Sequence, residues 1–200
     1  MNFLFNIDRY FKFGKRPDMK VDNNGWLLGV EQRHSPFFNA RPVGKKINLL
    51  VIHGISLPEN KFGTTYIDDL FLGKIDINKH PSFASLKGLQ VSAHIVINRE
   101  GIIRQYVSFL KRAWHAGVSC FENIENCNDY SIGIELEGSR DFFYEDKQYQ
   151  ALILLTKTIM QKFPDITLDR IVGHKDIAPV RKTDPWDTFD WQRFFNGPLA

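Results

Sequence analysis

Cysteine is scarce in this chain of 200 residues, which contains only Cys120 and Cys127. Two thiols are too few for the disulfide framework of a small secreted domain. Their spacing also fits no common zinc ribbon or redox pair. The sequence therefore predicts two ordinary reduced thiols, with a single disulfide in an oxidising compartment as the alternative.

Long apolar runs are also absent, because no stretch approaches the roughly 20 residues that a membrane-spanning helix requires. Residues 1–9 do not have the pattern of a signal peptide, since Asn6 and Asp8 interrupt the apolar stretch and no basic region precedes it. The sequence therefore predicts a cytoplasmic protein without a transmembrane segment.

Neither sign of charge dominates, because the chain has 26 lysine and arginine residues and 23 aspartate and glutamate residues, which gives a formal net charge of +3. The basic excess lies in residues 1–46, which hold nine basic and four acidic side chains, so the remainder is slightly acidic. No nucleic-acid-binding motif accompanies this charge. We therefore expect no nucleic-acid partner, and a monomer is the default expectation.

The composition is typical of a folded protein, with 43% hydrophobic and 24% charged residues. Residues 1–24 are predicted to be an N-terminal appendage, because a short helical spacing of apolar residues precedes a basic stretch, Pro17 and the turn-forming run 22–25. A short helix docked on the domain, or a loose arm, is favoured over a basic amphipathic helix at a membrane surface. Residues 25–200 are the main domain.

Strand and helix patterns alternate through this domain. Strands are predicted over residues 47–53, 91–97, 102–107, 131–137 and 170–173. Helices are predicted over residues 67–72, 78–86 and 145–163. The pattern predicts an α/β fold, with a mixed central β-sheet of about five or six strands flanked by helices.

Polar residues that can carry chemistry stand at the ends of these strands. His53 closes the first strand, and His174 follows the last strand and a glycine. Glu135 points away from the aliphatic face of its strand, and Asp184 lies ten residues after His174. Two histidines and one carboxylate are the protein ligands of a catalytic zinc site, which keeps a fourth position open for water. A further carboxylate can move protons, and a lysine such as Lys182 can stabilise an oxyanion.

Spacing alone leaves structural interpretations open. A histidine at a strand end is more often a hydrogen-bonded structural residue than a ligand, and no compact zinc motif is present. Glu135 and Glu137 would also fit an exposed polar face, and Asp184 would fit a turn. His34 and His80 match no motif and are predicted to lie at the surface or in loops.

Six blocks of sequence carry a resemblance to a known family. They are residues 51–58, 62–71, 91–94, 112–119, 127–138 and 173–185. In this order and spacing they resemble the AmpD-type 1,6-anhydro-N-acetylmuramyl-L-alanine amidases, and the resemblance covers about residues 25–195.

The resemblance implies a zinc-dependent enzyme with the fold of N-acetylmuramoyl-L-alanine amidases and peptidoglycan recognition proteins. It implies hydrolysis of the amide bond between the lactyl group of (1,6-anhydro-)N-acetylmuramic acid and L-alanine, in small muropeptides recycled from peptidoglycan. The implied residues are His53, His174 and Asp184 as zinc ligands, Glu135 and Lys182 as catalytic groups, and Tyr66, His94, Trp114 and His115 near the substrate. Core packing is an equal alternative for Trp114.

The chain departs from the family pattern at three positions. Gln90 and Asn126 are neutral where basic residues are common, and Trp186 stands where glycine commonly follows the Asp–Pro pair. Two other functions fit less well. A fragment-binding module without catalysis is disfavoured because all the ligands and catalytic groups are present. An exported amidase acting on intact cell wall is disfavoured because the expected export signal is absent.

Overall fold

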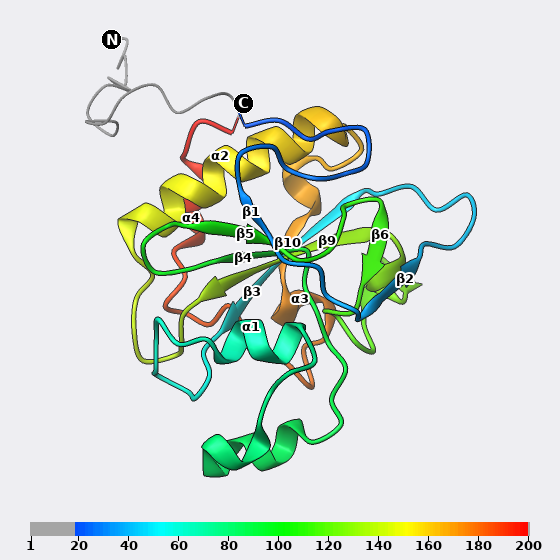
Figure 1. Ribbon diagram of the computed structural model, residues 1–200. Helices are drawn as coiled ribbons and strands as arrows, with labels where there is room; N and C mark the ends of the chain where they lie inside the picture. Colours follow the sequence, from blue (N-terminus) through cyan, green and yellow to red (C-terminus); the bar gives the residue numbers. More distant parts are fainter. Residues whose placement is uncertain (1–18, 200) are drawn as a thin grey trace, which may run out of the picture.

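A six-stranded sheet forms the centre of residues 19–199, the part of the chain that the computed structural model describes (Figure 1). The strand order is β1-β5-β4-β9-β3-β10, and all neighbours are parallel except β4 and β5. The strands are β1 (Glu31–Gln32), β3 (Leu49–Ile55), β4 (Ile95–Ile97), β5 (Ile103–Gln105), β9 (Ser131–Glu137) and β10 (Ile171–Gly173). This confirms the predicted mixed α/β sheet.

Helices and two small sheets surround the central sheet. The small sheets pair β2 (Phe38–Ala40) with β6 (Lys111–Ala113), and β7 (Cys120–Phe121) with β8 (Ile124–Glu125). The α-helices are α1 (Tyr66–Phe71), α2 (Asp146–Lys162), α3 (His174–Ile177) and α4 (Trp191–Phe195). Short 3₁₀ helices span Ile77–Lys79, Pro81–Leu86, Cys127–Asp129 and Leu168–Arg170.

Most predicted elements are confirmed, but two need correction. The helix predicted over residues 78–86 consists of two 3₁₀ turns, because His80 is extended and Pro81, which has no N–H, begins the second turn. The strand predicted over residues 91–97 is regular only over Ile95–Ile97, although the backbone of His94 already bonds to Gly133 and Tyr106. Ser92, farther back, bonds to Phe37 and Trp114 instead of to a strand of the central sheet.

Helix α2 covers one face of the sheet. Its first turn is closed by Gln148, whose Oε1 accepts from the backbone N–H of Glu145 at 3.0 Å. Its inward side chains pack on alternate residues of β3, β4 and β9, in a cluster that includes Leu152, Leu155, Ile159, Leu50, Ile52, Ile95, Ile97, Ile132, Ile134 and Leu136. Because side chains alternate along a strand, His53 and Glu135 face away from α2.

The opposite face has two smaller apolar clusters. Helix α1 contributes Ile67, Leu70 and Phe71 to one of them, against Ala93 and Val96. Leu49 and Val51 of β3 belong to the other, together with Tyr130 and Ile177. The space beyond Val51, toward the carboxyl ends of β3 and β9, is therefore left to polar side chains.

The described part of the predicted appendage packs on the domain. Met19 and Val21 contact the cluster beneath α2, and Val21 forms a β-bridge with Leu27. The helical spacing noted near the N-terminus lies outside the described residues.

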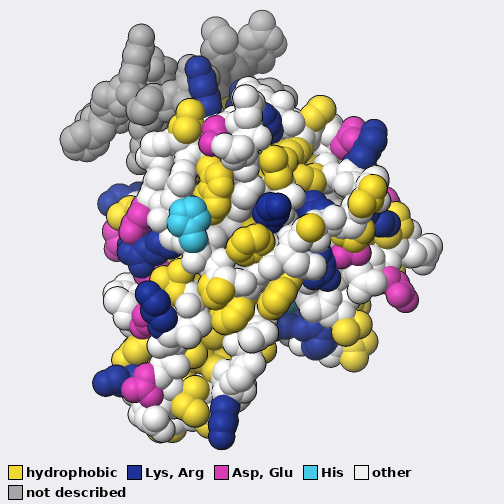
Figure 2. Space-filling model, turned by 45° about the vertical axis from the view of Figure 1, so that its right-hand side comes forward, with side chains coloured by type: hydrophobic (Ala, Val, Ile, Leu, Met, Phe, Trp, Pro, Cys, Tyr) yellow, Lys and Arg dark blue, Asp and Glu magenta, His cyan; other side chains and the backbone are white. Residues whose placement is uncertain are grey.

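The described surface mixes charges of both signs. On the face shown in Figure 2, basic and acidic side chains alternate with apolar ones and form no large area of one sign. None of the described helices combines the length and apolar character needed to cross a bilayer. Cys120 and Cys127 are both free thiols, and His34 and His80 lie outside the core, as predicted.

A guanidinium group that the sequence analysis did not single out fastens β2 to the central sheet. Arg41 is largely buried and donates to four backbone carbonyl groups, those of Phe109, Asn128, Asp129 and Ser131. Its contacts join the segment after β2 to the start of β9. Removing the guanidinium leaves several buried carbonyl oxygens without donors, which is costly.

We expect Arg41→Met to lower the free energy of unfolding by at least about 2 kcal/mol, because the carbonyl groups lose their donors. Urea denaturation measures this loss. Lys46→Met is the matched control, since Lys46 forms an exposed pair with Asp165 at 3.3 Å and should change stability by less than about 0.5 kcal/mol. Equal effects of the two substitutions would contradict the role assigned to Arg41.

Candidate active site

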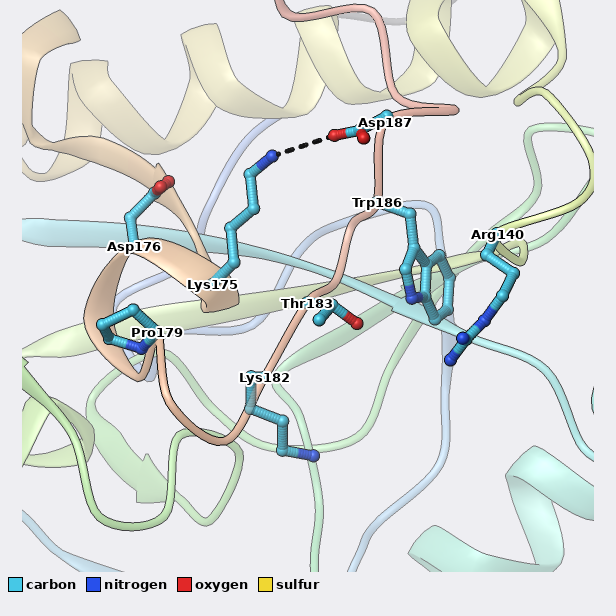
Figure 3. A pocket seen from close by; sticks show the side chains of 8 residues that line it. All are labelled: Arg140, Lys175, Asp176, Pro179, Lys182, Thr183, Trp186 and Asp187. Carbon is cyan, nitrogen blue, oxygen red and sulfur yellow. Dashed lines mark hydrogen bonds and ion pairs between the residues drawn. The ribbon is translucent and has the colours of Figure 1, made fainter.

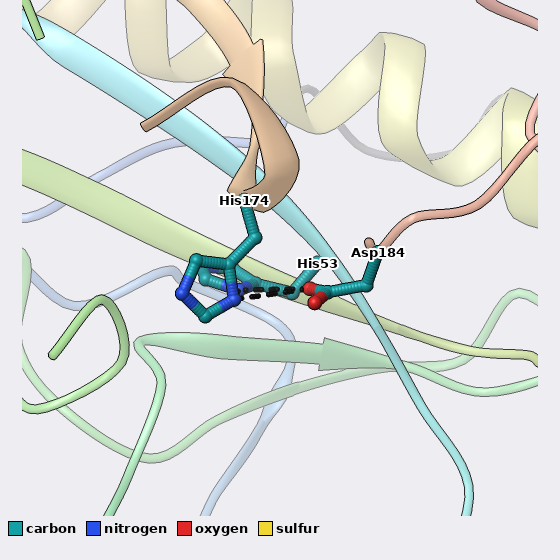
Figure 4. A group of neighbouring side chains, drawn as sticks. All are labelled: His53, His174 and Asp184. Carbon is teal, nitrogen blue, oxygen red and sulfur yellow. Dashed lines mark hydrogen bonds and ion pairs between the residues drawn. The ribbon is translucent and has the colours of Figure 1, made fainter. Parts of the chain in front are cut away.

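Two histidines and an aspartate meet at the carboxyl end of the sheet. His53 lies near the end of β3, and His174 opens α3 immediately after β10, which is paired with β3. Asp184 lies in the loop that follows α3, and its carbonyl accepts from the backbone N–H of Lys175 at 2.9 Å. Figure 4 shows the two imidazole rings and the carboxylate pointing toward one another.

The three side chains present a compact set of ligand atoms. Nδ1 of His53 lies 2.9 Å from Nδ1 of His174 and 3.4 Å from Oδ2 of Asp184, and the remaining distance, between His174 Nδ1 and Asp184 Oδ2, is 3.1 Å. Ligand atoms around a four-coordinate ion at about 2.0–2.1 Å stand about 3.3 Å apart. The spacing therefore fits a small divalent cation.

The second nitrogen of each ring fixes which atom faces the centre. His174 Nε2 lies 3.1 Å from the carbonyl oxygen of Ala116, which can only accept, so Nε2 carries a proton. In the neutral ring this leaves the lone pair on Nδ1, the atom that faces Oδ2 of Asp184. His53 Nε2 lies 2.9 Å from Nδ1 of His115, whose Nε2 lies 3.1 Å from the hydroxyl of Ser131. This relay lets His53 donate outward through Nε2 and present Nδ1 to the centre. Such outer partners are typical of metal-binding histidines.

Burial keeps the ring of His53 neutral. Burial and the neighbouring His174 lower the pKa of His53 to about 4, so its ring is unprotonated near pH 7. Two buried imidazole lone pairs and a carboxylate oxygen directed at one point stabilise each other only when a cation lies between them. The group can therefore hold a metal ion.

Glu135 stands directly beside this group. It is paired in register with His53 across β9 and β3, and its side chain is 9% exposed. Its Oε2 atom is buried without a hydrogen-bond partner. Burial, followed by the nearby Asp184 carboxylate, raises the pKa of Glu135 to about 8. A carboxyl group of this kind can accept and release a proton near neutral pH.

The alternative of an exposed polar face on β9 is wrong. Glu137 is 2% exposed, and its two carboxylate oxygens accept from the backbone N–H groups of Gly63 at 2.6 Å and Arg99 at 3.2 Å. It fixes the loops on either side of β9. Glu135 has no such partners, which separates the two glutamates.

Lys182 lies on the same loop as Asp184. Its backbone N–H donates to the carbonyl of Ala178 at 2.9 Å, which holds the turn after α3. The side chain is half-buried, and its positive charge is near enough to oppose protonation of both Glu135 and His53. A single loop thus supplies a candidate ligand and a cation to the same site.

Two of the predicted substrate contacts lie behind the candidate ligands. The ring of His115 rests on Gly133, where an added Cβ would lie 2.5 Å from it. His94 is completely buried, accepts from the N–H of Gly133 at 3.0 Å and lies 3.0 Å from the carbonyl of Lys111. His115 therefore contacts the candidate ligand His53 directly. His94 contacts the backbone of β9 beside it.

Tyr66 and Trp114, the other two predicted contacts, lie farther out. Tyr66 opens α1 and packs edge-on against Phe83, with 5.0 Å between ring centroids. Trp114 is half-buried, stacks on Phe37 and donates from Nε1 to the side chain of Asn39 at 2.9 Å. Trp114 is therefore not a fully buried core residue, and neither side chain contacts the three candidate ligands within the described contacts.

Tyr144 was not found by sequence reasoning. Its hydroxyl donates to the carbonyl of Pro185 at 3.1 Å and lies against Gly54 and Gly138, where an added Cβ would meet the tyrosine at 2.3 Å. It holds the loop after Asp184 against the end of β3. A tyrosine in a loop after a strand carries no sequence signal for this contact.

We compare the free energies of unfolding of Glu135→Gln and the unmodified protein, both treated with a chelator. We expect the variant to become more stable, relative to the unmodified protein, as the pH rises. The folded-state pKa of Glu135 is raised, so its favourable contribution is complete below the unfolded value of 4.5 and is lost as the pH rises through about 8. Glutamine does not ionise. Urea denaturation should therefore show the variant gaining about 4 kcal/mol relative to the unmodified protein between pH 5 and pH 9. The exposed Glu125→Gln is the control, and a difference that stays constant with pH would contradict the environment described for Glu135.

Comparison with known proteins extends the resemblance found in the sequence. The pattern of the N-acetylmuramoyl-L-alanine amidase family matches residues 43–187. The 1,6-anhydro-N-acetylmuramyl-L-alanine amidase AmpD of Haemophilus influenzae is 54% identical over 178 residues, which cover 89% of this chain and 97% of that protein. AmpD of Escherichia coli is 52% identical over 170 residues, covering 85% and 92%.

Solved structures of amidases are also similar to this chain. The crystal structure of a selenomethionine derivative of AmpD is 50% identical, with a TM-score of 0.85, and the match covers 88% of this chain and 98% of that one. AmiD of Escherichia coli, solved with the substrate anhydro-N-acetylmuramic acid-L-Ala-D-γ-Glu-L-Lys, is 31% identical, with a TM-score of 0.54 and coverage of 90% and 65%. The chain therefore belongs to the N-acetylmuramoyl-L-alanine amidase family.

Proposed function

We propose that this amidase is zinc-dependent and hydrolyses the amide bond between the lactyl group of 1,6-anhydro-N-acetylmuramic acid and L-alanine in muropeptides. One observation carries the assignment of the centre. Three convergent ligand atoms of His53, His174 and Asp184 lie beside the buried carboxyl group of Glu135, whose Oε2 atom has no hydrogen-bond partner. The similarity to AmpD over nearly the whole chain supports the choice of bond and substrate.

The donor set favours zinc. Two imidazole nitrogens and one carboxylate oxygen, with no thiolate, leave one position of a tetrahedron for water or substrate, as in other catalytic zinc sites. The distances of 2.9–3.4 Å between the ligand atoms fit this geometry. When bound, a zinc ion supplies Lewis acidity that polarises the amide carbonyl and acidifies a water molecule.

Glu135 is proposed to move the protons. It accepts a proton from the attacking water and delivers it to the departing amine of L-alanine, so that the carboxylate is regenerated in each turnover. Burial raises its pKa to about 8, which suits a group that must both accept and release a proton near neutral pH. The register of β9 with β3 holds the carboxyl group beside His53.

Lys182 is proposed to stabilise the negative charge that develops on the carbonyl oxygen. Its ammonium group already acts electrostatically on Glu135 and His53, so it lies near the reacting atoms. In a site shielded from water, such a charge stabilises the transition state more than it does in solution. The products are the anhydromuramic acid and a free peptide that begins with L-alanine.

We also propose that the reaction takes place in the cytoplasm, on fragments returned from the cell wall, as the AmpD resemblance implies. Cell fractionation tests this placement. Recovery of the activity only outside the cytoplasm would favour an exported amidase.

The function is tested with zinc-loaded protein and anhydro-N-acetylmuramyl-L-Ala-D-γ-Glu-L-Lys. Mass spectrometry should detect the free tripeptide and the intact sugar acid as the two products. Tight binding of the muropeptide without release of peptide would instead indicate a fragment-binding module.

We expect His53→Ala, His174→Ala and Asp184→Ala each to retain less than a tenth of the zinc of the unmodified protein, because each removes one of only three ligands. Elemental analysis and calorimetric zinc titration measure this loss. His34→Ala is the control, since this exposed histidine lies away from the site and should leave the stoichiometry at one zinc per chain. Full metal loading of His53→Ala would contradict the proposed ligands.

We expect Glu135→Gln to lower kcat at least about 100-fold while zinc remains bound, because the proton carrier is lost but the ligands are not. Steady-state kinetics together with metal analysis separate the two effects. The exposed Glu125→Gln should match the unmodified enzyme. Near-normal turnover of Glu135→Gln would remove Glu135 from its proposed role.

A further inference from the structure

The loop that carries Lys182 and Asp184 projects from the domain after α3. It runs past Pro179 and Val180, which are both exposed to solvent. The side chain of Lys182 lines a cavity of about 490 Å³ beside this loop (Figure 3). Among the described residues, no hydrogen bond or ion pair holds its ammonium group. The position of this group therefore depends on how the backbone of the loop is held.

A guanidinium group in the same loop provides such a hold. Arg181 donates from Nη2 to the carbonyl oxygens of Ala116 at 2.6 Å and Val118 at 2.8 Å. Both hydrogen atoms of Nη2 are thereby used. Gly117, between these two carbonyl groups, has a φ of +60°, and a Cβ added there would lie 3.1 Å from Nη2. The guanidinium group therefore lies directly against this stretch of backbone.

The segment that Arg181 binds is itself anchored to the body of the domain. The backbone N–H groups of His115 and Ala116 both donate to Oδ1 of Asn128, at 3.1 and 2.8 Å. Asn128 is buried, and its own carbonyl accepts from the guanidinium group of Arg41. These bonds fix the segment independently of the loop. The contact with Arg181 therefore positions the loop rather than the segment.

The same segment lies behind both histidines of the candidate metal centre. Nδ1 of His115 is 2.9 Å from Nε2 of His53. The carbonyl oxygen of Ala116 is 3.1 Å from Nε2 of His174. Because a carbonyl oxygen has two lone pairs, that of Ala116 can accept from His174 and from Arg181 together. Arg181 thus places its loop against the backbone that also orients the two imidazole rings.

We propose that Arg181 is a positioning residue, whose guanidinium group holds the loop on residues 116–118 and so keeps the ammonium group of Lys182 at the metal centre. This role rests on the proposed function, in which Lys182 stabilises the developing oxyanion. An ammonium group on a loop that moves spends less time beside the reacting atoms, and a small misplacement of a catalytic group lowers the rate strongly.

Direct contact with the substrate is the alternative role of Arg181, and kinetics separate the two. A contact that is equally strong in the ground state and the transition state changes KM and leaves kcat unaltered. Loss of positioning lowers kcat instead, because Lys182 acts when charge develops on the carbonyl oxygen.

The kinetic test is a double-mutant cycle on the zinc-loaded full chain with anhydro-N-acetylmuramyl-L-Ala-D-γ-Glu-L-Lys. We expect Arg181→Met to lower kcat about tenfold or more, with less than about a twofold change in KM and one zinc ion still bound per chain. Lys182→Met should lower kcat about 100-fold. The double variant should match Lys182→Met, because Arg181 acts through Lys182.

The matched control is Arg193→Met, which should leave kcat and KM unchanged. Arg193 pairs with Asp146 at 2.7 Å and lies over the ring of Tyr149, and both partners belong to α2, the helix on the other face of the sheet.

Three kinetic results would overturn the proposed role. Losses that multiply in the double variant would show that Arg181 acts independently of Lys182. A raised KM with an unchanged kcat in Arg181→Met would identify a substrate contact. Loss of zinc from Arg181→Met would place its effect on the metal ligands instead.

Hydrogen exchange followed by mass spectrometry tests the hold on the loop without any turnover. The backbone N–H groups of Arg181 and Lys182 both donate to the carbonyl of Ala178 at 2.9 Å. We expect Arg181→Met to speed exchange in residues 178–184 about tenfold or more, since two hydrogen bonds that oppose local opening are lost. Exchange in β3 and β9 should stay unchanged.

The exchange experiment also separates this role from the amidase function. If the unmodified zinc-loaded protein hydrolyses no muropeptide, the proposed function fails, while faster exchange confined to residues 178–184 still supports the hold by Arg181. Equal exchange in the variant and the unmodified protein would overturn that hold, whatever the turnover.

Discussion

The parallel register of β3 with β9 and β10 decides where the reactive groups of this protein lie. His53 on β3 and Glu135 on β9 are paired in register, so their side chains lie next to each other on one face of the sheet. His174 directly follows β10, the neighbour of β3 on the other side. All three reach the same edge because parallel strands end together. A shift of β3 by one residue would turn His53 into the core beneath α2 and expose the apolar side chains there. The packing of α2 therefore also positions the site.

Several polar groups are buried together at this edge, and their arrangement can hold a cation among them. The outer nitrogens of His53 and His174 are satisfied by His115 and the carbonyl of Ala116, so the inner nitrogens face the centre as acceptors. Gly133 gives His115 its place by leaving room above β9. Buried acceptors that face one another are costly without a shared positive charge. A metal ion bound here would therefore also stabilise the folded state.

Much of this arrangement could be predicted from the sequence, because it depends on strand periodicity. The alternation in residues 131–137 predicts that Glu135 points away from the aliphatic face, and the histidines follow apolar runs that form β3 and β10. The assignment of the ligands and of Lys182 came from the family resemblance, and the metal-binding roles remain proposals. Arg41 and Tyr144 could not be predicted, since their contacts join residues distant in the chain. The short strands β1, β2, β7 and β8 have two or three residues, too few for a periodic signal.

The central claim is that a single zinc ion, held by His53, His174 and Asp184, is required for amide hydrolysis. The most direct test strips the full chain with a chelator and returns zinc in measured steps, while following release of the tripeptide from anhydro-N-acetylmuramyl-L-Ala-D-γ-Glu-L-Lys. The account predicts negligible hydrolysis by the stripped protein and a linear return of activity that ends at one zinc per chain. Full activity in the stripped protein, or a return that requires a second zinc ion, would contradict it.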